Sequence, residues 1–133
     1  MIIEDIMTKK VITVELDTEV KQIKKIFHDI NIHHVIVVEN KVVRGVISDR
    51  DVLKCISPYA GTPAEEERDS YTLTKKAHQI MSRKVISVIP STTLRVAAKL
   101  LLKENISCLP VVDESNIIKG IVSWRDLLLA ATK

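Results

Sequence analysis

The chain repeats itself, and this duplication restricts the possible folds more than any other feature. Residues 6–14 return as residues 80–88, 74 positions later, with the same Ile-Met and Val-Ile pairs. After one extra residue in the polar stretch around Ser115, the match resumes 75 positions apart, as 44–53 and 119–128. Because surface turns tolerate such insertions, the sequence predicts a tandem duplication of a unit of roughly 50 residues.

Each copy shows the same series of secondary-structure signals. A run rich in Val and Ile, residues 11–14 or 85–88, predicts a first strand. Asp17 and Ser91 then hold equivalent positions, where a side-chain oxygen can cap a helix. Apolar residues recur at helical spacing after both caps.

The helix of each copy is expected to end at an asparagine, Asn31 or Asn105, because asparagine tolerates the left-handed backbone of a helix end. Wholly apolar runs follow at 34–38 and 108–112. A run without polar alternation predicts a strand that is buried on both faces. A polar turn, a third strand and a last helix complete each copy.

The predicted order is therefore β-α-β-β-α, twice, which is an α/β (α+β) fold. The first strand, helix and second strand are expected to form a right-handed crossover. A unit of this size is too small to bury a proper core alone, so we expect the copies to pack about a pseudo-two-fold axis with clefts between them. The predicted boundaries are 2–56 and 78–131 for the repeats and 57–77 for the connecting insertion.

The insertion contains its own helix signal. Residues 62–65 read Thr-Pro-Ala-Glu, which has the form of a capping box with proline at the first helical position. The charged stretch 65–69 follows. The simpler interpretation is a solvated, partly helical excursion, and the alternative is a surface on which a partner docks.

Composition excludes several classes of protein. Aromatic residues are only 3% of the chain, too few for the stacking platforms of single-strand nucleic-acid binders, and the net charge is only +3. The apolar runs are far shorter than the roughly 20 residues of a membrane helix. Residues 1–5 lack the pattern of a signal peptide, and two cysteines make no disulfide framework. We therefore expect a cytoplasmic protein with no nucleic-acid or membrane partner.

Two tetrads carry the chemistry: Ser-Asp-Arg-Asp at 48–51 and Ser-Trp-Arg-Asp at 123–126, each expected to open the last helix of its copy. A carboxylate can accept both hydroxyls of a ribose diol. The serine, the free backbone N–H groups and the arginine suit phosphate oxygens. The same Ser-x-x-Asp spacing is also a capping box, which needs no ligand. The two interpretations are compatible, although capping does not require the arginine.

On these motifs the chain resembles a tandem pair of CBS domains, often called a Bateman module. The resemblance covers 2–56 and 78–131, and its motifs are Ile-Met-Thr/Ser, Asn-Ile-Ser-Cys-Leu-Pro-Val-Val-Asp and Gly-Val/Ile-Ile/Val-Ser-x-Arg-Asp. The insertion also resembles that of short stand-alone bacterial CBS-pair proteins. The resemblance implies a regulatory module without catalysis and without a required cofactor. Its implied ligands are AMP, ADP, ATP or S-adenosylmethionine, and in some members cyclic dinucleotides. It also implies a homodimer, a disc of four repeats, and an unidentified regulated protein.

The resemblance also assigns residues to two clefts between the repeats. Those of the first cleft are Ser48, Arg50, Asp51, Ser82, Ile86, Ser107 and Cys108, with His33 and His34 reaching the phosphates. Those of the second cleft are Ser123, Arg125, Asp126, Thr8, Ile12, His33 and His34. The clefts are expected to differ, because Trp124 is bulky where Asp49 is small, and His-Val-Ile at 34–36 replaces the family-like Cys-Leu-Pro at 108–110.

The two histidines leave alternatives open. His33 and His34 could contact phosphate or base, could bind a metal with Cys108, or could be structural. No spacing matches a metal signature, and a zinc site would need four ligands. Cys108 is expected to be a small buried side chain rather than a nucleophile, and no set of nucleophile, base and orienting group can be assembled.

Three functions are compatible with these features. The favoured hypothesis is a sensor in which an adenosine-containing ligand shifts a dimer or partner equilibrium, which requires that the ligand bind one state better. The alternative is a nucleotide-independent dimeric scaffold with degenerate clefts. An enzyme or DNA-binding regulator is disfavoured, because the two repeats account for almost the whole sequence.

Overall fold

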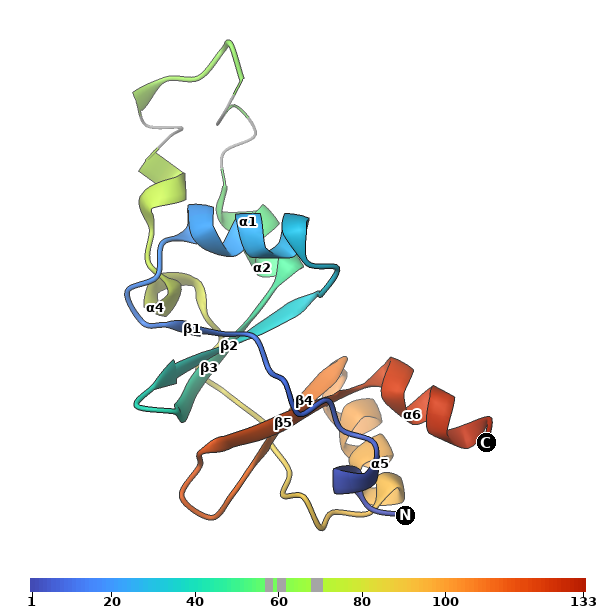
Figure 1. Ribbon diagram of the computed structural model, residues 1–133. Coiled ribbons are helices and arrows are strands. Elements are labelled where there is room, and N and C mark those ends of the chain that lie inside the picture. Colours follow the sequence, from blue (N-terminus) through green and yellow to red (C-terminus); the bar gives the residue numbers. More distant parts are fainter. Residues whose placement is uncertain (57–58, 60–61, 68–70) are drawn as a thin grey trace. The chain divides into compact units, whose positions relative to one another are not determined.

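The computed structural model describes residues 1–56, 59, 62–67 and 71–133, and divides into two compact units (Figure 1). Unit 1 comprises Met1–Val11, Asn40–Val43 and Val85–Lys133. Unit 2 comprises Ile12–Glu39 and Arg44–Lys84. The mixed α+β class and the two series of strands and helices predicted from the sequence are confirmed.

Unit 2 contains a three-stranded sheet in the order β1-β2-β3. Its elements are β1 (Thr13–Glu15), α1 (Val20–Asp29), β2 (His34–Glu39), β3 (Val42–Ser48), α2 (Asp49–Cys55) and α4 (Ala77–Ile80), the first two residues of β3 belonging to unit 1. Strands β1 and β2 run parallel, as a crossover requires, with Val14 opposite Val37. The turn between β2 and β3 is Asn40-Lys41, with φ of 52° and 68°, typical of a two-residue hairpin.

Unit 1 is built around the antiparallel pair of β4 (Cys108–Val112) and β5 (Ile118–Ser123). Its helices are α5 (Leu94–Glu104) and α6 (Trp124–Ala131). Cys108 lies opposite Ser123 in the register. The longer loop before β5 is held by the Asp113 carboxylate, which accepts hydrogen bonds from the N–H groups of Ser115 and Ile117.

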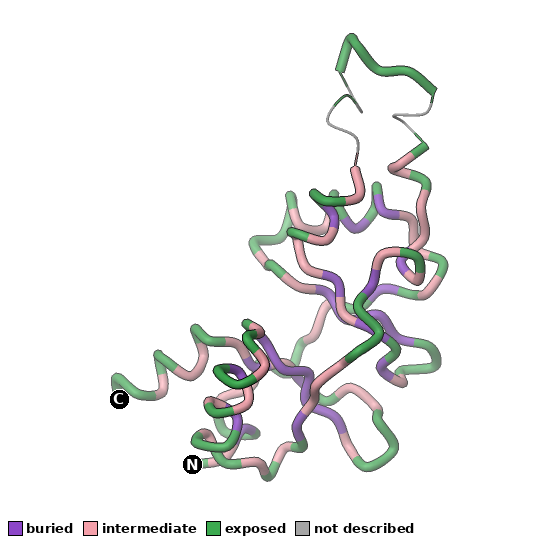
Figure 2. The backbone as a smooth tube through the Cα atoms, turned by 180° about the vertical axis from the view of Figure 1, so that it is seen from behind, coloured by how far each residue is buried: buried purple, intermediate pink, exposed green. Residues whose placement is uncertain are grey.

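Strands β2 and β4 are the most buried strands of their units, and Figure 2 shows the burial of each residue along the backbone. Four consecutive residues of β2, 35–38, are buried, and all five residues of β4 are buried. This confirms the prediction that the uninterrupted apolar runs form strands covered on both faces. Helix α1 adds Val20 and Ile23 to the core of unit 2, and α5 adds Ala97 and Leu101 to that of unit 1.

Each unit contains the opening segment of the other repeat. Residues 1–11 belong to the first repeat, yet Thr8 exchanges two backbone hydrogen bonds with Ile121, of 2.9 and 3.0 Å. Ser82 of the second repeat does the same with Val46, at 2.9 and 3.2 Å. The two repeats therefore exchange their first segments, which the duplication in the sequence does not reveal.

A methionine and a glycine meet in each exchange. A Cβ placed on Gly45 would lie 2.5 Å from Met81 Sδ, and one placed on Gly120 would lie 2.6 Å from Met7 Sδ. Both distances are too short for a non-bonded contact of a Cβ atom. The absence of a side chain at the glycines therefore provides the space into which the methionines pack. The Ile-Met motif and the glycine of the Gly-aliphatic motif are thus partners in space.

The predicted helix caps Asp17 and Ser91 are wrong. Helices α1 and α5 start later, with Glu19 and Thr93 as the capping residues. The reason lies in the preceding turn, where the Thr18 hydroxyl accepts a hydrogen bond from the backbone N–H three residues before it, at 3.0 Å. The second copy repeats this turn, so the chain stays non-helical for two more residues.

The predicted asparagine helix ends are correct in one copy only. Asn105 follows α5 in the left-handed conformation, with φ of 53°. Helix α1 instead ends at Asp29, and Ile30 is already extended with φ of −117°. Ile30 then accepts a hydrogen bond from the N–H of Ile32 in a tight turn, so Asn31 needs no left-handed backbone.

The predicted first strand of the second repeat, 85–88, forms only one parallel bridge, between Val88 and Val111. In the first repeat, the Ile36 N–H donates to the Ile12 carbonyl. The residue equivalent to Ile36 is Pro110, which has no N–H to donate. The proline therefore removes the hydrogen bond that would extend this strand.

The predicted start of a helix in residues 62–65 is also wrong. The Glu65 N–H donates to the Thr62 carbonyl at 3.0 Å, and the Thr62 hydroxyl donates to the Tyr59 carbonyl instead of capping a helix. Residues 62–64 form a bend and a turn, whereas Glu67 and Tyr71 are helical and a short 3₁₀ helix follows at Thr72–Thr74, so only the predicted start of the helix is wrong. Residues 57–58, 60–61 and 68–70 of the insertion lie outside the described residues.

Replacing Gly45 by alanine should destabilise unit 2 by about 1–3 kcal/mol, because the added methyl group overlaps the Met81 side chain. The measurement is the free energy of unfolding in urea. The matched control is Gly45→Ala combined with Met81→Ala, which removes the overlap. The double variant should be less destabilised than the sum of the two single variants, and strict additivity would contradict the packing described here.

Candidate functional site

The first tetrad forms a closed cap at the junction of β3 and α2. The Ser48 N–H donates to Asp51 Oδ2 at 2.8 Å, and the Asp51 N–H donates to Ser48 Oγ at 3.1 Å. The capping interpretation is therefore confirmed here. Oδ1 of Asp51 makes no hydrogen bond to any described residue, so one carboxylate oxygen holds the backbone and the other can accept from a ligand.

The second tetrad has the same arrangement at the junction of β5 and α6. The Ser123 N–H donates to Asp126 Oδ2 at 2.8 Å, and the serine hydroxyl donates to the same oxygen at 3.1 Å. Within the described chain, Oδ1 of Asp126 also lacks a hydrogen-bond partner. We call Ser48, Arg50, Asp51 and Ser82 the unit 2 half-site, and Ser123, Arg125, Asp126 and Thr8 the unit 1 half-site.

The exchanged segments add the fourth member of each half-site. Ser82 pairs with Val46, two residues before Ser48 on the same strand. Thr8 pairs with Ile121, two residues before Ser123. Each half-site therefore combines residues of both repeats within a single unit.

The half-sites share a backbone contact and differ in the side chains that surround it. In unit 2 the Asp49 N–H donates to the His33 carbonyl at 3.0 Å, and His33 Nδ1 lies 2.9 Å from Asp49 Oδ2. In unit 1 the Trp124 N–H donates to the Ser107 carbonyl at 3.1 Å. The Trp124 indole N–H donates to the Ile106 carbonyl, also at 3.1 Å. The predicted difference between Asp49 and Trp124 thus becomes a difference in hydrogen bonding.

Two titratable groups next to the unit 2 half-site, Asp49 and His34, are perturbed. The hydrogen bond from His33 holds the pKa of the Asp49 carboxyl below its ordinary value. Burial lowers the pKa of His34, while Asp49 and Asp51 act in the opposite direction. At neutral pH the unit 2 half-site is therefore flanked by an ionised Asp49 and an uncharged His34.

The remaining predicted site residues are divided between the units. Ile12, His33 and His34 belong to unit 2, whereas Ile86, Ser107 and Cys108 belong to unit 1. Because each predicted cleft combines residues of both units, the assembly of the two clefts stays a prediction.

Cys108 is buried, and burial raises the pKa of its thiol to about 12. It is therefore a thiol at neutral pH and a poor nucleophile, in agreement with the interpretation of Cys108 as a buried small side chain. Among the described residues, no group of three or more His, Cys, Asp or Glu side chains could hold a metal ion.

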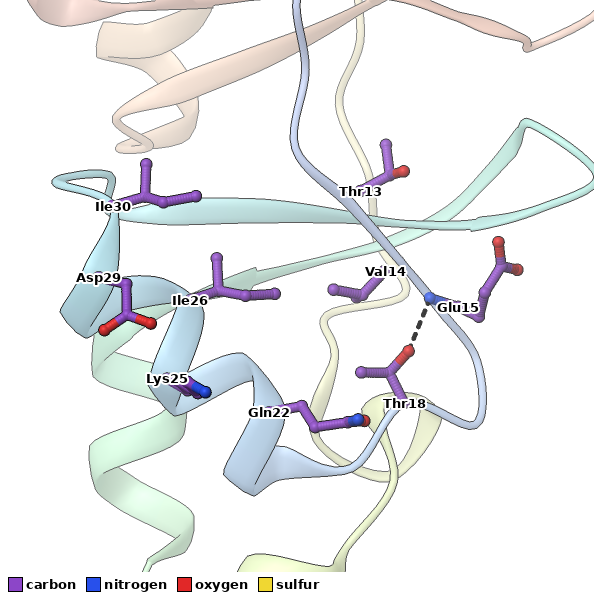
Figure 3. A pocket seen from close by; sticks show the side chains of 9 residues that line it. All are labelled: Thr13, Val14, Glu15, Thr18, Gln22, Lys25, Ile26, Asp29 and Ile30. Atoms are coloured by element: carbon purple, nitrogen blue, oxygen red, sulfur yellow. Dashed lines mark hydrogen bonds between the residues drawn. The ribbon is translucent and has the colours of Figure 1, made fainter.

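A pocket of about 590 Å³ on unit 2 was not expected from the sequence (Figure 3). It lies between β1 and α1 and shares no residue with the half-site. Its lining carries both signs of charge, from Glu15, Asp29 and Lys25, beside the apolar Ile26 and Ile30. In the figure the dashed line marks the turn hydrogen bond that precedes α1. Residues of β1 point alternately into the core and away from it. Because any half-buried strand shows this alternation, the sequence contains no separate signal for a pocket.

The sequence profile of the CBS domain matches residues 3–58 and 77–133. The chain belongs to the CBS domain family. A relative of similar size is the CBS domain-containing protein YhcV of Bacillus subtilis (strain 168), 30% identical over 125 residues, which cover 94% of this chain and 81% of that protein. The resemblance stated from the motifs is therefore confirmed.

Solved CBS domain pairs share the fold. The CBS domain pair of protein MJ0100, solved in complex with 5′-methylthioadenosine and S-adenosyl-L-methionine, is 26% identical, with a TM-score of 0.81 over 100% of this chain and 98% of that one. CBSX2, solved in complex with AMP, is 26% identical, with a TM-score of 0.82 over 98% of this chain and 96% of that one.

Some relatives are much longer than this chain. Homoserine O-acetyltransferase of Methanococcoides burtonii (strain DSM 6242 / NBRC 107633 / OCM 468 / ACE-M) is 29% identical over 126 residues, 94% of this chain but only 23% of that protein. The similarity is thus confined to a minor part of the enzyme.

In the described part of this chain, no helix has the length and apolar character needed to cross a membrane.

The stability of the chain should fall as the pH drops below about 6.5, in part because of His34. Burial lowers the folded-state pKa of His34 below its ordinary value of 6.5, so the unfolded chain binds the proton more readily. The contribution of His34 is fully present above pH 6.5 and is lost as the pH falls toward the folded-state pKa. Melting temperatures between pH 8 and pH 5 measure it.

His34→Gln is the matched variant, because the other three histidines remain and their titration is common to both proteins. The variant should lose less stability on acidification than the wild type. Equal slopes for the two proteins would show that His34 does not carry this pH dependence.

Proposed function

We propose that this chain is a regulatory module that binds adenosine-containing ligands, of the AMP, ADP, ATP or S-adenosylmethionine type, and signals their presence to a partner protein. Ligand binding would use the two half-sites and the predicted clefts. The module is non-catalytic and needs no cofactor, and the adenine nucleotide or S-adenosylmethionine acts as a regulatory ligand. We also propose a cytoplasmic location.

The observation that carries the proposal is the geometry of the two aspartates. In each half-site, Oδ2 completes the helix cap, while Oδ1 has no hydrogen bond within the described chain. A carboxylate with one oxygen held in place and the other unused is a preorganised acceptor for ribose hydroxyls. Membership of the CBS domain family adds support, since related CBS pairs were solved with S-adenosyl-L-methionine and with AMP.

Arginine and hydroxyl groups supply the remaining contacts in this proposal. Arg50 and Arg125 follow in the first turn of α2 and α6, where they can pair with phosphate oxygens. The Ser82 and Thr8 hydroxyls arrive on the exchanged segments. Because these segments link the two repeats, a ligand that holds them favours one arrangement of the exchange, and such a state preference is what regulation requires.

Substituting Asp51 by asparagine should weaken AMP binding at the unit 2 half-site by roughly tenfold or more, the usual value of a charge-assisted hydrogen bond. The asparagine Oδ1 can still accept from the Ser48 N–H, so the cap persists while the second acceptor is replaced by an N–H₂ donor. Asp126→Asn is the equivalent change in unit 1. Isothermal titration calorimetry and melting temperature together measure the two effects.

Thr93→Ala is the matched control, because it removes a helix cap that has no predicted ligand role. It should lower stability by about 0.5–2 kcal/mol and leave AMP binding unchanged. The proposal fails if the wild type binds none of AMP, ADP, ATP, S-adenosylmethionine or cyclic dinucleotides below millimolar concentration. It also fails if both asparagine variants bind AMP as the wild type does.

We further propose that the chain forms a homodimer through its helices, and a nucleotide-independent scaffold is the alternative function that this surface would serve. Large apolar side chains are exposed on the neighbouring helices α5 and α6, where Leu102 is 66% exposed and Leu128 is 61% exposed. Exposure of this extent on adjacent helices is typical of an interaction surface.

Leu128→Lys should shift the protein toward the monomer in analytical ultracentrifugation, because it places a charge in a surface that the dimer would bury. The wild type is expected near twice its monomer mass of 15.0 kDa. The control Lys99→Ala, which changes an exposed polar residue of α5, should leave the dimer intact. A wild type that sediments as a monomer at all concentrations would exclude the dimer.

A further inference from the structure

The two half-sites differ most at one pair of side chains, and we propose that Asp49 makes phosphate binding at the unit 2 half-site depend on a proton carried by His33. A phosphate-bearing nucleotide then binds this half-site together with one proton, whereas the unit 1 half-site binds its ligand without one. The inference rests on the proposed function, since it concerns the same site. Asp49 acts as a positioning residue, and His33 is the group that meets the phosphate.

The pair is well placed to meet a ligand. Asp49 is the first residue of α2, directly after Ser48, and two contacts join it to His33: a backbone hydrogen bond of 3.0 Å and the Nδ1–Oδ2 contact of 2.9 Å. The His33 side chain is 69% exposed and that of Asp49 is 42% exposed. A ligand bound beside Ser48 can therefore reach the imidazole.

The contact with Asp49 decides which ring nitrogen of His33 carries the hydrogen. An ionised carboxylate only accepts hydrogen bonds, so Nδ1 must be the donor. In the neutral imidazole, Nε2 then has a lone pair and no hydrogen. A phosphate oxygen is also an acceptor, and the two lone pairs cannot form a hydrogen bond. A proton on Nε2 turns this nitrogen into a donor and makes the contact possible.

The net charge of the His33–Asp49 pair also favours phosphate binding when His33 is protonated. With neutral His33, the pair carries the full negative charge of Asp49, which opposes a phosphate. With protonated His33, the pair has no net charge. His34 also acts on Asp49, Asp51 acts on His34, and the backbone N–H of Arg50 donates a hydrogen bond to Asp49. The hydrogen bond from His33 also lowers the pKa of the Asp49 carboxyl, which keeps Asp49 ionised.

The unit 1 half-site provides a natural comparison. Ser107 and Trp124 occupy the positions equivalent to His33 and Asp49, and they keep the same backbone hydrogen bond, of 3.1 Å. Neither side chain gains or loses a proton between pH 5 and pH 8. The duplication has thus produced one half-site with a titratable pair and one without it.

The test measures AMP affinity from pH 5.5 to pH 8 in two backgrounds. Asp126→Asn weakens the unit 1 half-site and isolates unit 2, and Asp51→Asn does the reverse. AMP affinity of the unit 2 half-site should fall with rising pH by up to about tenfold per pH unit, the limit for one linked proton. The phosphate group of AMP titrates as well, but equally in both backgrounds, so only the difference between them is interpreted.

Asp49→Ala in the Asp126→Asn background is the decisive variant. Without the carboxylate, neutral His33 can carry its hydrogen on Nε2, so the additional pH dependence should become clearly smaller and only the part due to the charge of His33 should remain. His33→Gln should abolish the additional pH dependence, and its exposed position makes it a second variant that folds. Adenosine, which has no phosphate, should bind without the additional pH dependence in every background.

The outcomes separate the inference from the proposed function. Equal pH dependence in the two backgrounds, or full dependence retained in Asp49→Ala, overturns the role of the pair while leaving nucleotide binding intact. If Asp49 had a purely structural role, the Asp49→Ala variant would have a lower melting temperature and a lower AMP affinity at every pH. If the wild type binds none of AMP, ADP, ATP, S-adenosylmethionine or cyclic dinucleotides at any pH, the proposed function is overturned, and the inference with it.

Discussion

The exchange of opening segments between the repeats is the interaction on which the rest of the structure depends. Two pairs of backbone hydrogen bonds, at Thr8–Ile121 and Ser82–Val46, join the start of each repeat to the third strand of the other. The adjoining methionine packs into the space left by a glycine of that strand. An alanine at either glycine would push out the methionine and, with it, the neighbouring hydroxyl residue. The short Ile-Met-Thr/Ser motif therefore both holds the exchange together and delivers the side chain that completes each half-site.

In each Ser-x-x-Asp tetrad, one carboxylate can both cap the helix and accept a hydrogen bond from a ligand, so the two interpretations of the tetrad do not exclude each other. Oδ2 of Asp51 and Asp126 satisfies the N–H of the preceding serine, which orients the side chain, and Oδ1 then projects an unused acceptor in a fixed direction. One conformation of the aspartate side chain serves both uses, because the same two side-chain torsion angles direct Oδ2 to the cap and Oδ1 to a ligand. Combining the two uses therefore costs little free energy. This is the physical reason why sequence spacing alone could not choose between them, and why substitution by asparagine can.

The sequence predicts those features that depend on local chemistry, and it fails where a partner elsewhere in the chain decides. The apolar runs around Val35 and Leu109 are strands because nothing in them can face water. The caps at Asp17 and Ser91 fail because the threonine that follows each makes a turn first. The missing strand before Val88 depends on Pro110, a residue in the facing strand. The exchange itself was not predictable from the duplication, because two similar segments have similar local preferences and only the tertiary structure selects their partners.

The difference between the half-sites follows from what the backbone requires of each position. At residues 49 and 124 the fold needs an N–H that donates to the carbonyl of residue 33 or 107, and any residue except proline supplies it. The side chains at these four positions are therefore under little structural constraint. At the serine and aspartate of each tetrad, by contrast, the cap needs the side chains themselves, and both copies keep them. Duplication of one scaffold can thus retain the acceptor for a ribose in both half-sites while one of them acquires a histidine and a carboxylate. Those two groups change the charge presented to a ligand without changing the fold that holds it.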